Sequence, residues 1–274
     1  MTLSINTNIA ATRASKFLAA NHQNLQKSLD RLSSGRRITT ASDDAGGLAV
    51  SMKLEHSING LEGAAKNISN AISLLQVQDG ILDSAGQIVS RMGELKSMYS
   101  DVTKSSTDKA TYNQEYRDLI GQLNAMASAK FNNIGLFSAT ADTTLTVDVN
   151  GTNIEITQQG FASEINAGAA GEAIVAAVNA QTLDGNTSAQ LTDALEAIAS
   201  MRAANGGQVK RLEYSLSDVN SQITNLTAAN GRIMDVDIAS ESAALARHQI
   251  LVQASAAMVA QANAANNVAL QLLQ

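Results

Sequence analysis

The side chains that could carry acid–base or metal chemistry in this chain are few and far apart. There are three histidines, His22, His56 and His248, and no cysteine. Metal ligands and general bases act in sets at fixed spacing, such as histidines and a glutamate on one helix face. None of the three histidines has such a companion nearby in the sequence. We therefore expect all three at exposed helix positions.

A pair of carboxylates, Asp43 and Asp44, is the remaining candidate for a metal site. The pair lies in residues 39–47, a segment rich in turn formers, just before a long helical pattern. Carboxylates are favoured at a helix N-terminus because the helix dipole is positive there. We expect a helix cap and a polar subunit contact from this pair instead of a metal site, and Ser42 or Asp43 as the capping residue.

Sequence motifs, net charge and the N-terminal segment argue against several classes of function. The chain has no dinucleotide-binding, P-loop or serine-hydrolase motif, so we expect neither a cofactor nor an enzyme. Its net charge of −6 argues against general nucleic-acid binding, which relies on basic patches. The N-terminus has no basic region followed by an apolar run, so no ordinary cleaved secretory signal is expected.

The elements that must position these side chains are long helices. Proline is absent and aromatic residues make up only 3% of the chain. Because proline breaks helix interiors, its absence permits very long helices, and a core poor in aromatic bulk must be built from Ala, Leu, Ile and Val. Apolar periodicity predicts helices over residues 5–33, 48–99, 109–129 and 188–230, and a helical tail that ends at residue 274.

Two of these helices have apolar residues spaced alternately by three and four, which predicts coiled-coil seams. The first seam has positions 58, 61, 65, 68, 72, 75, 79, 82, 86 and 89, and then shifts to Ile88, Met92, Leu95 and Tyr99. The second has positions 191, 195, 198, 202, 205, 209, 212, 216, 219, 223, 226, 230 and 233. The helix over residues 109–129 has one apolar face, with Tyr112, Tyr116, Leu119, Leu123 and Met126.

The tail, residues 229–274, has no formal charge after Arg247. A membrane span needs about 20 predominantly apolar residues, and several Gln and Asn residues interrupt this run, so we expect no membrane partner. Apolar or small residues recur every seven positions, at Leu251, Met258, Ala265 and Leu272. Such a helix buries too little alone to stay ordered, and we expect copies of the chain to complete its packing.

The middle of the chain, about residues 138–187, differs from the rest. Residues 145–149 and 152–157 alternate in polarity around Asn150-Gly151, which predicts a β-hairpin. We also expect a short helix over residues 168–180 and a loop at 184–186. The predicted fold is mainly α: long antiparallel coiled-coil helices from both chain ends form a rod, with a small β-hairpin-containing module in the middle.

Both ends of the chain closely resemble bacterial flagellins. The N-terminal matches are Ile5-Asn6-Thr7-Asn8, Arg31-Leu32-Ser33-Ser34-Gly35, Arg37-Ile38, Asp43-Asp44-Ala45, Gly47-Leu48-Ala49 and Phe131-Asn132-Asn133 with Leu136. The C-terminal matches are Arg232-Ile233, Asp235, Asp237, Ala239, Glu241, Ile250-Leu251, Gln253-Ala254 and Ala260-Gln261-Ala262-Asn263. The resemblance covers residues 1–137 and 188–274. Unlike many members, the chain lacks a proline near residue 264, ends in Gln274 and has a short middle.

The resemblance implies a structural subunit that polymerises into an extracellular filament for motility. It implies an inner domain of residues 1–45 plus 235–274, a spoke domain of residues 46–137 plus 188–234, and an outer segment of residues 138–187. It also implies export by the flagellar type III apparatus without a cleaved signal. The implied partners are further copies of the chain, the export apparatus and its chaperone, and the filament cap and hook-junction proteins.

Two groups of residues follow as candidate sites. For polymerisation and core packing we expect Leu18, Leu25, Leu29 and Leu32 against Ile250, Leu251, Met258, Leu270 and Leu273. Arg91, Glu94 and Leu95 match the family's segment for the innate receptor Toll-like receptor 5. Ser90, Met92 and Gly93 depart from that segment, which implies weakened recognition. For Arg91 and Glu94, contact with a neighbouring subunit is the competing interpretation.

Two other functions remain open on the sequence. A hook–filament junction protein of the same superfamily shares this organisation, although the matches at both ends and the short middle favour flagellin. An amphipathic lipid-binding helical protein needs a basic face beside a bulky apolar face, and the last 27 residues have neither.

Overall fold

The computed structural model describes residues 8–137, 143–146, 153–156, 182–185 and 187–271, with only the backbone for 143 and 265–271. The chain divides into two compact units. Unit 1 comprises Met1–His56 and Asn225–Gln274, and unit 2 comprises Ser57–Thr224.

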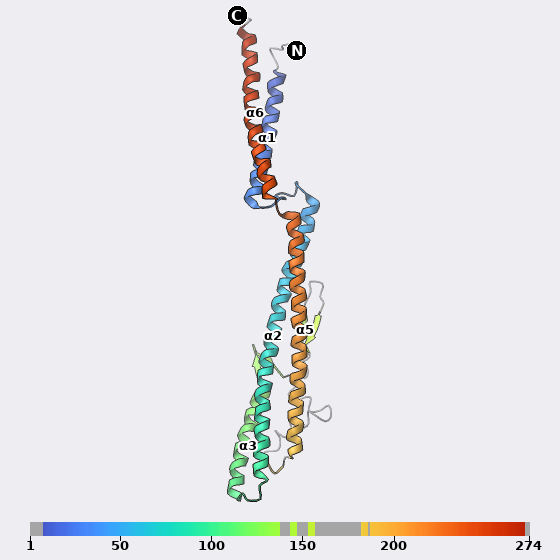
Figure 1. Ribbon diagram of the computed structural model, residues 1–274, viewed down its shortest axis with the longest axis vertical. Coiled ribbons are helices and arrows are strands. Elements are labelled where there is room, and N and C mark those ends of the chain that lie inside the picture. The colour runs from blue at the N-terminus through green and yellow to red at the C-terminus, as the bar shows by residue number, and fades with distance from the viewer. Residues whose placement is uncertain (1–7, 138–142, 147–152, 157–181, 186, 272–274) are drawn as a thin grey trace. The chain divides into compact units, whose positions relative to one another are not determined.

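Long helices dominate the described chain, which confirms the mainly α prediction (Figure 1). They are α1 (Ile9–Ser34), α2 (Ala45–Tyr99), α3 (Ser106–Ala127), α5 (Ser188–Met234) and α6 (Ile238–Gln271). Each helix matches a predicted one, with small differences at the ends. The helix predicted over residues 168–180 lies outside the described residues.

In unit 1, α1 and α6 run side by side and antiparallel (Figure 1). The Asn8 side-chain amide donates to the Ala262 carbonyl over 2.9 Å. Arg31, near the other end of α1, lies 3.7 Å from Glu241 in the first turn of α6. Polar contacts therefore join the two helices near both ends of α1.

Local signals set the ends of α1. The Asn8 side-chain oxygen accepts a hydrogen bond from the backbone N–H of Ala11 at 2.9 Å and so caps the N-terminus. Gly35 ends the helix with a left-handed backbone, φ 70°, a conformation that a residue with a Cβ adopts at a cost.

The cap of α2 is Asp44, so the expectation of Ser42 or Asp43 is wrong by a residue or two. Asp44 Oδ1 accepts from the backbone N–H of Gly47 at 2.8 Å. The Asp43 carboxylate instead accepts from the Thr39 N–H and hydroxyl and the Thr40 N–H, and pairs with Lys27 of α1. Asp43 therefore holds the preceding loop, and the helix begins one residue later.

In unit 2, α2 contributes two columns of buried residues, each repeating every seven positions. One column, Leu61, Ile68, Leu75, Leu82 and Val89, is the predicted one. The other is Ala64, Ala71, Gln78, Ala85 and Met92. Met92 is buried as predicted, whereas the predicted positions of the rest of this column were 65, 72, 79 and 86. The interface is rotated toward the small alanines because they permit close approach and because Asp79 at its centre would bury a charge.

The same displacement occurs on α5. The column Leu191, Ile198, Asn205, Leu212 and Val219 is buried as predicted. Its companions are Ala194 and Met201, while the predicted Leu195 is exposed. The predicted Arg202 lies beside the seam and reaches Asp79 and Asp83 of α2.

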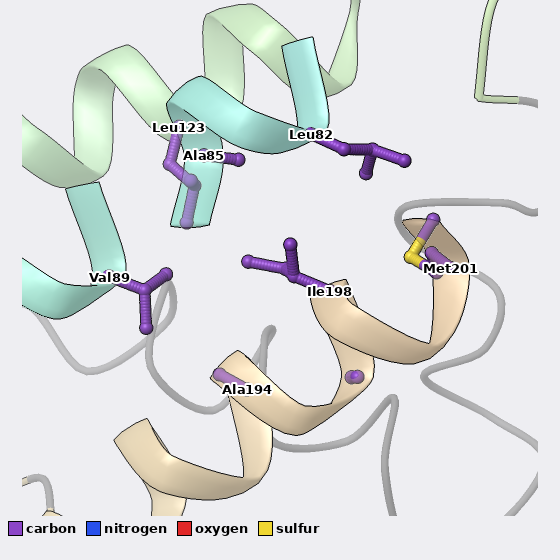
Figure 2. Close-up of a cluster of buried hydrophobic side chains, with 8 residues drawn as sticks. Leu82, Ala85, Val89, Leu123, Ala194, Ile198 and Met201 are labelled. Carbon is purple, nitrogen blue, oxygen red and sulfur yellow. The ribbon is translucent and has the colours of Figure 1, made fainter. Parts of the chain in front are cut away.

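Three helices meet in the core of unit 2 (Figure 2). Leu82, Ala85 and Val89 of α2 face Ala194, Ile198 and Met201 of α5, with Leu123 of α3 alongside. A second cluster joins Met92, Leu95, Tyr116, Ile120, Leu183 and Leu191. On α3 the predicted Tyr116 and Leu123 are buried, and Ile120 is an additional core residue.

Two short hairpins belong to unit 2. β1 (Lys130–Phe131) pairs antiparallel with β2 (Ile134–Gly135). Asn132 and Asn133 between them have φ of 49° and 66°, as a two-residue type I′ turn requires. Sequence analysis treated these asparagines only as part of a family segment and missed this hairpin.

The predicted hairpin near residue 150 is also present. β3 (Thr143–Thr146) pairs antiparallel with β4 (Asn153–Ile156), with Leu145 opposite Ile154. A two-residue turn at Asn150-Gly151 would instead place Leu145 opposite Ile156, so the strands pair two residues out of that register. The turn itself lies outside the described residues.

Candidate functional site

Among the residues that the structure describes, the acidic side chains and histidines form no cluster that could hold a metal ion. Within the part of the chain that the structure describes, no group of three or more His, Asp and Glu side chains comes together. His22 and His56 are exposed, as expected, whereas His248 is half-buried on the face of α6 toward α1. His248 is the exception among the three histidines.

The strongest candidate surface lies on the terminal helices, and it is apolar. Leu18, Leu25 and Leu32 are half-buried along the seam between α1 and α6. The expected partner residues on α6 do not meet them within the chain: Ile250 is 66% exposed and Met258 52% exposed.

Two further expected residues, Leu29 and Leu251, are also exposed. The fully buried positions of this helix pair are instead Ala14, Ser28 and Ser255. The seam within one chain is therefore built from small and polar residues, with the leucines at its edge. The Leu270 side chain and Leu273 lie outside the described part.

Sequence analysis missed three members of this exposed apolar surface, Ile9, Phe17 and Ile238. The sequence does contain a signal for the outward position of Phe17. Phe17 and Leu18 are adjacent, and neighbouring helix residues point about 100° apart, so one seam cannot hold both. The adjacent Ile250 and Leu251 carry the same signal. We define the terminal apolar surface by seven exposed residues: Ile9, Phe17, Leu29, Ile238, Ile250, Leu251 and Met258.

A salt bridge joins α1 to the loop that precedes α2 in unit 1. Lys27 Nζ lies 2.6 Å from Asp43 Oδ1. This ammonium group, together with hydrogen bonds from Thr39 and Thr40, holds the pKa of the Asp43 carboxyl well below its usual range. The Arg37 guanidinium donates to the Ile233 carbonyl, which ties the loop after α1 to the end of α5.

Arg91, Glu94 and Leu95, which resemble the receptor-binding segment of the family, lie on α2 in unit 2. Arg91 Nε lies 2.8 Å from Glu115 of α3, and its Nη1 lies 2.8 Å from Glu94. The Glu115 carboxylate raises the pKa of Arg91 most strongly, and the Glu94 carboxylate raises it further. Leu95 is fully buried in the cluster with Tyr116 and does not reach the surface.

A groove of about 460 Å³ lies between α2 and the two hairpins. Its apolar lining includes Ala71, Leu74, Phe131, Ile134, Leu145 and Ile156, and its polar lining Asn67, Asn70, Ser73 and Asn132. Among the described residues that line the groove, no side chain is acidic or basic.

Along the described helices, no stretch is long and apolar enough to cross a membrane.

Comparison with known proteins identifies both ends of the chain. Residues 5–142 match the model of the bacterial flagellin N-terminal helical region, and residues 189–273 match the bacterial flagellin C-terminal helical region. The chain is 36% identical to a flagellin of Halalkalibacterium halodurans, over 98% of this chain and 99% of that protein. It is 34% identical to the flagellar filament 33 kDa core protein of Treponema phagedenis, over 98% and 99%.

Among solved structures, a putative flagellar hook-associated protein from Vibrio parahaemolyticus resembles the chain with a TM-score of 0.51 and 15% identity. That match covers 71% of this chain and 97% of the other, and it bears on the fold alone. The sequence matches span the chain from end to end, on both sides of the short middle. The chain belongs to the bacterial flagellin family.

Proposed function

We propose that this chain is a structural subunit that polymerises into a flagellar filament through the terminal apolar surface of α1 and α6. The main support for this proposal is that these seven large apolar side chains are exposed in the single chain. Burying one such side chain is worth about 1.5–3 kcal/mol. Water-exposed surface of this kind on two neighbouring helices fits a contact with further copies of the chain.

Ordering of the terminal helices and assembly are coupled in this proposal. The α1–α6 pair buries few large apolar side chains, so the pair gains little to offset its conformational entropy when alone. Contacts with neighbouring copies supply the missing burial. Because such contacts are heterologous and do not close into a ring, they extend into a helical polymer.

We further infer the domain arrangement: residues 1–45 plus 235–274 inside, residues 46–137 plus 188–234 as the spoke, and residues 138–187 outside. The two compact units support a division of this kind. Their boundaries fall after residue 56 in α2 and before residue 225 in α5, so unit 1 includes about ten more residues of each helix than the proposed inner domain. The Ser51–Asn230 hydrogen bond, 2.6 Å long, explains why the adjoining turns of both helices belong with unit 1.

The proposal includes a location and partners. The filament is extracellular, and the subunit leaves the cell by the flagellar export apparatus, with a chaperone and without cleavage of a signal. The filament cap and the hook-junction proteins contact its ends. Family membership supports these assignments.

A contact with Toll-like receptor 5 is part of the proposal, in weakened form. Exposed Arg91 and Glu94 would supply it, while buried Leu95 would act by supporting the helix. Gly93 contributes no side chain to that face. Arg91→Ala tests this contact: receptor binding should fall while the helical spectrum is unchanged, and unchanged binding contradicts it.

The assembly proposal is tested by placing a charge on the terminal apolar surface. Ile250→Glu should abolish filaments, because a carboxylate would be buried without a partner. Gln249→Glu adds the same charge at a neighbouring exposed position and should assemble. Sedimentation and negative-stain imaging after seeding measure both, beside a chain that lacks residues 230–274.

Two outcomes would contradict the proposal. Normal filaments from Ile250→Glu would show that this surface is not an assembly contact. A full chain that binds filament ends but never elongates would favour a hook–filament junction protein instead.

A further inference from the structure

One level of the α2–α5 interface in unit 2 is polar. Gln78 and Asn205 are 4% and 5% exposed and interrupt columns of otherwise apolar residues. Beside them, Arg202 Nε lies 3.0 Å from Asp79 and its Nη1 lies 2.6 Å from Asp83. We call Gln78, Asp79, Arg202 and Asn205 the polar layer.

Both buried amides donate a hydrogen bond to a backbone carbonyl, but the Asn205 amide is only partly satisfied. Asn205 Nδ2 donates to the Leu75 carbonyl at 2.8 Å, and Gln78 Nε2 donates to the Leu136 carbonyl at 3.1 Å. Asn205 Oδ1 is buried and has no hydrogen-bond partner among the described residues. A buried polar atom without a partner is unfavourable, so Asn205 at this position costs stability relative to an apolar residue.

The apolar columns alone do not select one alignment of the two helices. Large residues recur every seven positions on α2 (61, 68, 75, 82, 89) and on α5 (191, 198, 212, 219). A slide of α5 by seven residues, about 10 Å along the axis, would again set large residues opposite large residues.

The polar layer does distinguish these alignments. After a slide of seven residues, Arg202 would face positions 72 and 76 or 86 and 90, where the residues are Ile, Gln, Gly and Ser. Both of its carboxylate partners would be lost. Asn205 would move away from Gln78 to the level of Ile68 or Leu82, and each amide would then be buried alone.

We propose that the polar layer, with Asn205 at its centre, selects the alignment of α2 and α5 and does so at a cost in stability. A buried asparagine is known to set register in coiled coils in general. The inference concerns unit 2 of the single chain and is independent of the proposed polymerisation.

The experiment uses the full chain, which has no native cysteine to compete for labels. Nitroxide labels at Glu62→Cys and Asp218→Cys, both exposed positions, report the distance between α2 and α5 by pulsed electron resonance. In the parent chain one distance is expected. In Asn205→Leu combined with Arg202→Gln, a second population should appear, displaced as a slide of about 10 Å requires, while Tm rises by about 2–4 °C.

Ile198→Leu is the matched control, because it exchanges one buried apolar residue of the same column for another and leaves the polar layer intact. It should keep the single distance. A single parental distance in the Asn205→Leu, Arg202→Gln chain would overturn the proposal. Loss of helix content in that chain, measured by circular dichroism, would also overturn it, because the proposal requires a gain in stability.

Discussion

The Asn21 side-chain amide donates a hydrogen bond to the Ser255 hydroxyl over 2.8 Å, although the two residues are 234 positions apart. Ser255 in turn donates to the Leu251 carbonyl one turn earlier in α6, at 2.6 Å. Ser255 is 2% exposed and is among the few fully buried residues of this helix pair. A polar side chain thus lies where a coiled coil usually has a leucine.

We predict that Ser255→Ala loosens the terminal helices within assembled filaments. Loss of this bond leaves the Asn21 amide with only a 3.5 Å contact to the Leu251 carbonyl and should cost about 1 kcal/mol. Amide hydrogen exchange on filaments should then be about fivefold faster along α1 and α6. Ser242→Ala, at an exposed position of α6, should leave exchange unchanged. Equal exchange in both variants would show that the bond contributes nothing.

The start of α2 offers two neighbouring glycines with opposite expectations. A Cβ on Gly47 would lie 2.5 Å from Asp44 Oδ2 and 2.9 Å from Ile38 Cδ1, so Gly47→Ala displaces the cap and should cost about 2–3 kcal/mol. A Cβ on Gly46 meets nothing closer than 3.6 Å, so Gly46→Ala should stabilise by up to about 1 kcal/mol through helix propensity. Chemical denaturation measures both. A Gly47→Ala chain as stable as Gly46→Ala would contradict this account of the cap.

The Asp43–Lys27 pair predicts a particular response to acid. The folded pKa of Asp43 lies below its unfolded value of about 3.9. Its contribution to stability is therefore complete above that pH and is lost as the pH falls toward the folded pKa. The Tm difference between the parent chain and Asp43→Asn should be constant from pH 8 to about 5 and should shrink below about pH 4. A difference that instead changes near pH 7 would assign the effect to another group.

The β1–β2 turn gives a prediction from backbone conformation. Asn133 has φ 66°, in the left-handed region, where a glycine pays no steric penalty. Asn133→Gly should leave unit 2 as stable or slightly more stable, while Asn133→Ala should cost about 1 kcal/mol. Thermal unfolding of the two variants provides the comparison. A more stable Ala variant would rule out the left-handed turn as the cause.

The helices could be predicted because each carries apolar residues every seven positions over many turns. The same periodicity does not decide between companion positions three or four residues away, since both lie close to the first column on a helix surface. On α2 the second buried column contains the alanines at 64, 71 and 85, because their small side chains allow the neighbouring helices to pack closely. That information lies in the packing and is absent from the single helix.

The candidate surface was predicted in part for a similar reason. The large residues of the terminal helices were expected to serve polymerisation and core packing, without a distinction between contacts inside one chain and contacts with other copies. Ile250 and Met258 instead stay exposed, because Ala14, Ser28 and Ser255 permit a closer approach of the two backbones. Hydrophobicity identified the residues, but only the structure separates the inner face from the outer one. Strands of two residues, such as β1 and β2, are too short to show alternation at all.

The bond from Asn8 to the Ala262 carbonyl spans 254 positions and has a consequence for the order of folding. Closing a loop of nearly the whole chain carries a larger entropic penalty than forming contacts such as those between α2 and α3, which close shorter loops. It also gives the terminal pair the highest contact order in the molecule, so it should form last. Because a chain is synthesised from its N-terminus, α1 is without its partner until α6 has been made.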